Sequence, residues 1–120
     1  MSLVIQINDG ASAFRPGETI AGVASWTLPV APSRVDVELF WTTRGKGTVD
    51  SRIVEWARVE QPGSFGQKDF AFKAPLEPPS FSGKLVTLLW GLRLMVHPSQ
   101  EQAQVNLTIS PTGQEINLVV

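Results

Sequence analysis

The densest group of side chains with chemical potential is basic and surrounds two glycines. Arg44, Lys46 and Arg52 flank Gly45 and Gly47, a pattern typical of a hairpin tip. Cations spaced by glycine can bind a phosphate or an acidic partner peptide. The alternative interpretation is a solvated hairpin loop whose glycines serve only the turn. The spacing of a phosphate-binding P-loop, Gly-x-x-x-x-Gly-Lys-Ser/Thr, is absent.

Aromatic side chains could add a stacking surface beside these cations. The sequence has four tryptophans, Trp26, Trp41, Trp56 and Trp90, and no tyrosine. Three of them share the phase of apolar residues and are expected in the core, whereas Trp56 lies in an ambiguous segment and is the one expected at the surface. Together with Arg44, Lys46 and Arg52, it would form a site for a small anion or a sugar. The lack of tyrosine disfavours a carbohydrate-binding surface.

The sequence contains few residues that could catalyse a reaction or bind a metal. There is no cysteine, and the single histidine, His97, precedes Pro98 at the end of a predicted strand, where we expect a loop residue. Four aspartates are dispersed along the chain: Asp9, Asp36, Asp50 and Asp69. We therefore predict no catalytic, cofactor-binding or metal-binding residues and no enzymatic activity. A deep pocket with His97 near a carboxylate would revive an enzymatic interpretation.

The elements that would position these residues are predicted to be strands. Apolar and polar residues alternate with period two over residues 20–28, 34–44, 67–73 and 104–109, and turn signals separate the runs. In the second run the apolar positions are Val35, Val37, Leu39 and Trp41, and only Phe40 breaks the pattern. With the terminal runs 3–7 and 116–120, the sequence predicts an all-β, immunoglobulin-like sandwich of about seven to eight antiparallel strands without significant helix.

Two further segments are strands with a complication. Residues 85–96 are apolar at every even position and mixed at the odd ones, which predicts a central strand whose second face is covered by a loop or by another chain. Residues 52–60 offer two competing inner faces, which a β-bulge would reconcile. The segment 74–83 contains three prolines, so we expect it to leave the sheet as a stiff loop.

Length and charge limit the organisation and the partners. The 120 residues fit one domain, 1–120, because a domain typically takes about 100 to 150 residues. The formal net charge is −1, which argues against nucleic acid and anionic membranes as partners. The N-terminus lacks a basic signal-peptide region, and the longest apolar run is shorter than the about 20 residues that span a bilayer. We expect a soluble, cytoplasmic protein.

Three passages in this order resemble the arrestin family, specifically its N-terminal type of domain. They are the Pro-Gly-Glu turn with its apolar flanks at 14–23, the alternating strand at 34–41, and the passage from Phe70-Ala71-Phe72 through Pro78-Pro79-Ser80-Phe81 to the strand at 86–96. The resemblance covers residues 14–96. It implies an arrestin-like β-sandwich that acts as a non-catalytic adaptor or trafficking scaffold and holds partners at edge strands and loops.

The sequence also departs from that family. Arrestins carry two such domains in tandem, whereas this chain has room for one, which suggests a single-domain bacterial relative. No residues match the family's charged core or phosphate-sensing lysines, so receptor binding is not implied.

Two functions follow as predictions. The first is a protein-interaction module that binds through edge strands or through its proline loop, and that forms a homodimer or larger assembly through Leu85, Leu89 and Met95 on the second face of the central strand. The alternative is a module that binds a small anion or carbohydrate through Arg44, Lys46, Arg52 and Trp56.

Overall fold

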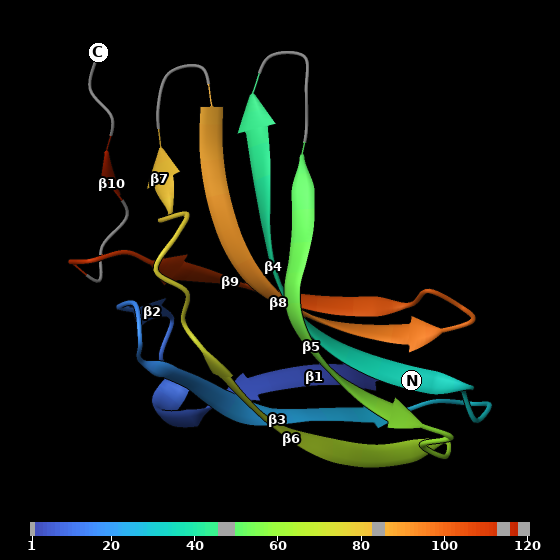
Figure 1. Ribbon diagram of the computed structural model, residues 1–120. Helices are drawn as coiled ribbons and strands as arrows, with labels where there is room; N and C mark the ends of the chain where they lie inside the picture. The colour runs from blue at the N-terminus through green and yellow to red at the C-terminus, as the bar shows by residue number, and fades with distance from the viewer. Residues whose placement is uncertain (1, 46–49, 83–85, 113–115, 118–120) are drawn as a thin grey trace.

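The computed structural model describes residues 2–45, 50–82, 86–112 and 116–117, which form two β-sheets (Figure 1). The smaller sheet has the order β1 (Ser2–Ile7), β3 (Thr19–Thr27) and β6 (Phe65–Lys73), all antiparallel. The larger sheet follows the order β10 (Ile116–Asn117), β7 (Phe81–Ser82), β8 (Val86–His97), β4 (Arg34–Gly45) and β5 (Ser51–Glu60). In addition, β9 (Gln102–Ile109) pairs with β8, and β2 (Ala13–Phe14) pairs with β9. The predicted all-β sandwich is confirmed.

The chain passes from the smaller sheet to the larger one directly after β1. After β1, the short 3-10 turn η1 (Asn8–Gly10) carries the chain across to β2, which pairs in parallel with Thr108 and Ile109 of β9. β7 and β10 form a second short parallel pair. The long strands nevertheless pair antiparallel, as the alternation predicts.

β8 is the central strand that its apolar pattern predicts. β4 accompanies it along its whole length on one side. On the other side β7 pairs with Thr87 and Leu88, and β9 pairs with β8 from Trp90 to Met95. In Figure 1 the upper halves of β4, β5 and β8 curve away from the smaller sheet.

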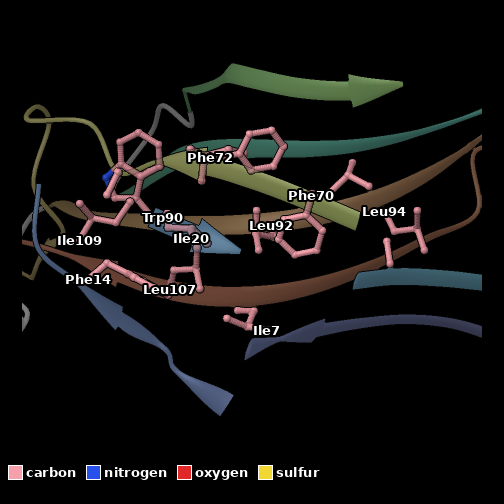
Figure 2. Close-up of a cluster of buried hydrophobic side chains, with 14 of the residues drawn as sticks. Ile7, Phe14, Ile20, Phe70, Phe72, Trp90, Leu92, Leu94, Leu107 and Ile109 are labelled. Atoms are coloured by element: carbon pink, nitrogen blue, oxygen red, sulfur yellow. The ribbon is translucent and has the colours of Figure 1, made fainter. Parts of the chain in front are cut away.

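The core lies between the two sheets and is almost entirely aliphatic and aromatic. Trp90 and Leu92 are fully buried, and the Phe70 and Phe72 rings stack with their centroids 5.8 Å apart. The Trp90 indole N–H donates to the carbonyl of Pro78 at 2.7 Å, which fastens the proline segment over the core. Figure 2 shows these side chains converging from both sheets.

The β-bulge predicted for residues 52–60 is present. Leu39 is opposite Glu55, but its neighbour Phe40 is opposite Ile53, so Val54 is the extra residue. The bulge reverses the phase of β5, since Val54, Ala57 and Val59 pack against the core while Ile53 and Trp56 point outward. The proline segment does leave the sheet after Lys73, but it ends earlier than predicted because Phe81 and Ser82 already pair with β8.

Candidate functional site

A buried carboxylate occupies the outer face of the larger sheet. Asp36 of β4 is only 2% exposed although it points away from the core. The Nε atom of Arg58, directly across on β5, donates to Asp36 Oδ1 at 2.8 Å, and the Nε atom of Arg34 donates to Oδ2 at 3.3 Å. Two guanidinium groups therefore compensate one desolvated charge.

His97 also faces this carboxylate. Its Nε2 atom lies 3.4 Å from Asp36 Oδ2 and is buried without a hydrogen-bond partner in the described part of the chain. The prediction of a loop residue is wrong here, because His97 is the last residue of β8 and its register opposite Arg34 brings it to Asp36.

A second ion pair stands two residues further along β4. Glu38 is 8% exposed and accepts a hydrogen bond from Arg93 Nε on β8 at 2.7 Å. The Arg93 guanidinium also lies over the Phe40 ring, 4.7 Å from its centroid, which is a cation–π contact. Phe40, the residue that breaks the alternation, is thus buried on the outer face by an arginine.

In this cluster the positive charges are exposed and the negative charge of Asp36 is buried beneath them. The Arg34 and Arg58 side chains are 38% and 40% exposed, whereas that of Asp36 is 3% exposed. The hydrogen bond that Arg58 donates to Asp36, and secondly the negative charge of Asp36, raise the pKa of Arg58 further above its usual value, so this guanidinium is charged at every physiological pH. The arginines are therefore the solvent-accessible part of this cluster. The exposed Glu60 lies beside Arg34 at the end of β5.

Trp56 stands at the rim of the same cluster. Its side chain is 59% exposed, and its neighbour on the outward side of β5, Ile53, is 42% exposed. Both border an open depression of about 390 Å³. We call the surface that lines this depression the Trp56 face. It consists of Arg34, Asp36, Glu38, Ile53, Trp56, Arg58 and His97.

The titratable groups of this arrangement are held by ion pairs rather than left free. His97 is near a carboxylate, but the depression is open, and its lining contains no serine, threonine or lysine that could act as a nucleophile. The oxygens of Asp36 are already engaged by Arg34 and Arg58. In the part of the chain that the structure describes, no three histidine, aspartate or glutamate side chains gather as a metal site, and no helix is long and apolar enough to cross a membrane.

Among the residues predicted for a small-ligand site, the three that the structure describes lie apart from one another. Arg44 and Arg52 are exposed at the β4–β5 hairpin, and Lys46 lies outside the described residues. Arg52 pairs with Trp41, which packs against the core, so it lies on the opposite face of the sheet from Trp56. Arg44 is six residues along β4 from Glu38, the partner of Trp56, or about 20 Å away. Of the three described residues, only Trp56 belongs to the Trp56 face.

Of the residues predicted for homodimerisation, the two that the structure describes are separated from one another. Leu89 and Met95 are half-buried on the outer face of β8, and Leu85 lies outside the described residues. Between Leu89 and Met95 stand Gly91 and Arg93, so the two side chains do not form a continuous apolar strip.

The sequence interpretation missed Asp36, Glu38, Arg34, Arg58 and Arg93 as a group. The alternation places them correctly on the polar side of their strands. A usable signal was the combination of acidic side chains on one predicted strand with arginines on two others, because oppositely charged side chains on neighbouring strands can pair across a sheet.

Comparison with known proteins yields a structural likeness. No protein-family model matches the chain, and no curated protein matches its sequence. The crystal structure of Spo0M, the sporulation control protein from Bacillus subtilis, superposes with a TM-score of 0.60 at 19% sequence identity. The match covers 91% of this chain and 49% of that chain, so this chain spans about half the length of Spo0M. The likeness shows the fold alone, which is the arrestin-like β-sandwich that the motifs predict.

Proposed function

We propose that the protein is a non-catalytic interaction module that holds a protein partner on the Trp56 face. The observation that carries the proposal is Trp56 itself, a tryptophan 59% exposed at the rim of a depression in the outer face of the sheet. Tryptophan and arginine are the side chains most enriched among residues that dominate binding energy at protein interfaces.

The chemistry of the Trp56 face specifies the partner. Trp56 and Ile53 offer apolar contact at the edge of the depression, and the exposed ends of Arg34 and Arg58 offer hydrogen-bond donors beside them. The matching partner surface presents an apolar side chain next to a carboxylate. Because Asp36 and Arg93 hold the guanidinium groups and the Phe40 ring in place, little side-chain entropy is lost on binding.

The fold of Spo0M, described as a sporulation control protein, supports a regulatory rather than a catalytic role. The membership of the arrestin-like family, a cytoplasmic location and a bacterial origin are part of the same proposal.

The test compares two exposed aromatic side chains. Proteins captured from the source cells by the tagged wild-type chain are purified, and their dissociation constants are measured by calorimetry. Trp56→Ser should raise the dissociation constant of a partner that binds the Trp56 face about 30-fold. This corresponds to the loss of a hot-spot side chain that contributes about 2 kcal/mol. The matched control is Phe65→Ser on β6, where the phenyl ring is 75% exposed. Equal effects of the two substitutions, or no effect of Trp56→Ser, would overturn the proposal.

A further inference from the structure

The two sides of the sandwich differ in how their edge strands are protected. On one side the edges are β5, which pairs only with β4, and β6, which pairs only with β3 in the described part of the chain. β5 contains the bulge at Val54 and carries Arg52, Glu55, Arg58 and Glu60, and β6 carries Lys68, Asp69 and Lys73. Bulges and charged side chains hinder the addition of a further strand.

The opposite side has neither form of protection. β1 and β9 contain no charged residue and no proline, and their registers with β3 and β8 run without a shift. β2 covers β9 only at Thr108 and Ile109, so no described strand pairs with the outer edge of Gln102–Leu107.

Burial along β9 shows that this edge is open. Under β2, Leu107 and Ile109 are 5% and 0% exposed. Beyond β2 the inward side chains Ala103 and Val105 are only half-buried, as are Leu3 and Ile5 of the facing β1. Where the chain crosses from β1 to β2, a notch of about 570 Å³ opens beside Val105. An added strand at this edge would cover apolar side chains.

We propose that the Gln102–Leu107 edge of β9 pairs antiparallel with the same edge of a second copy, so that the larger sheets of two molecules become one. In a two-fold pair centred on Gln104, Gln102 lies opposite Asn106 of the second copy, and Ala103 lies opposite Val105. Side chains keep their faces in such a pair, so amides meet amides on the outer face and apolar groups meet on the inner face.

A second copy fits this edge better than an unrelated charged chain. The edge has no charge with which to attract a partner of opposite sign, and none that would repel an identical strand. Glutamine and asparagine side chains donate and accept hydrogen bonds, so the outer row of Gln102, Gln104 and Asn106 complements itself. The proposed dimer leaves the Trp56 face open, because that face borders β5 on the far side of β4 and β8.

Sedimentation velocity on the full chain tests the dimer. The wild type should dimerise with rising concentration, and Gln104→Lys should raise the dimer dissociation constant at least tenfold, since two ammonium groups then meet across the two-fold axis. The matched control is Gln67→Lys, an exposed glutamine of β6, which should leave the constant unchanged. Circular dichroism verifies that each variant is folded.

Cross-linking gives a second readout that does not depend on destabilising the pair. The chain has no cysteine, so Gln104→Cys supplies its only thiol. Oxidation by copper(II) phenanthroline should convert two such thiols into one intermolecular disulfide, whereas Gln67→Cys should remain largely monomeric. A wild type that is monomeric at several hundred micromolar would overturn the proposal. So would a dimer insensitive to Gln104→Lys but weakened by Gln6→Lys on β1 or Met95→Gln on β8.

Discussion

The two faces of strand β4 are both buried, but by different means. On the inner face Val35, Val37 and Leu39 are at most 1% exposed, because the smaller sheet packs against them. On the outer face Asp36, Glu38 and Phe40 are 2–8% exposed, although no second sheet among the described residues covers them. Their cover consists of long side chains from the same and neighbouring strands, chiefly Arg34, Arg58 and Arg93.

This difference separates stability from specificity. Burying apolar surface between sheets contributes directly to stability. An ion pair at the outer face contributes less to stability, because the cost of removing its charges from water offsets their attraction. The outer cluster instead fixes the positions of the guanidinium groups beside Trp56. Substitutions on the inner face should therefore lower stability most, and those on the outer face should do so less.

The largest effect is expected on the inner face. Leu39→Ala leaves a cavity in a fully buried site and should lower the free energy of unfolding by about 3 kcal/mol. Urea unfolding followed by tryptophan fluorescence measures this, at one fixed protein concentration because the proposed self-association would add to the apparent stability. A loss below about 1 kcal/mol would show that the inner face is not the main source of stability.

An intermediate effect is expected for the buried carboxylate. Asp36→Asn removes the charge but keeps the shape, and the half-exposed Arg34 and Arg58 can rehydrate, so the loss should be about 1–2 kcal/mol. The same urea experiment measures it, with the exposed Asp69→Asn as the control, expected within about 0.5 kcal/mol of wild type. If Asp36→Asn proved as costly as Leu39→Ala, the two faces of β4 would not differ as described.

The smallest effect is expected where the outer face is tightly packed. A Cβ at Gly91 would lie 2.8 Å from Phe40 Cζ and 3.1 Å from the Val105 carbonyl oxygen. Gly91→Ala should therefore cost about 1 kcal/mol by overpacking.

The phenyl ring provides the check on this mechanism. In a double-mutant cycle, Phe40→Leu should recover part of the loss, because the leucine side chain vacates the space at Gly91. Strictly additive losses would mean that the contact with the Val105 carbonyl, rather than the Phe40 ring, sets the cost.

Local patterns predicted the strands because they depend only on neighbouring residues. The alternation at Val35, Val37 and Leu39 and the competing phases of Ile53 and Val54 are properties of one strand at a time, so the bulge could be inferred before any pairing was known. The exposure of Trp56 followed from the same ambiguity.

Pairing between strands could not be read in this way. Arg52 and Trp56 are only four residues apart, yet the bulge at Val54 places them on opposite faces, which separates the predicted ligand-binding residues. Likewise, Asp36 meets Arg58 and His97 only because β5 and β8 both flank β4 in one register.

The sequence by itself determined that the chain is an all-β sandwich, because period-two burial and turn residues act over a few residues. Only the tertiary structure decided that β4 is central and that its carboxylates are buried under arginines. It also decided that β2 stops short of Gln102–Leu107. These outcomes depend on contacts between residues far apart in the chain, whose geometry no local pattern encodes.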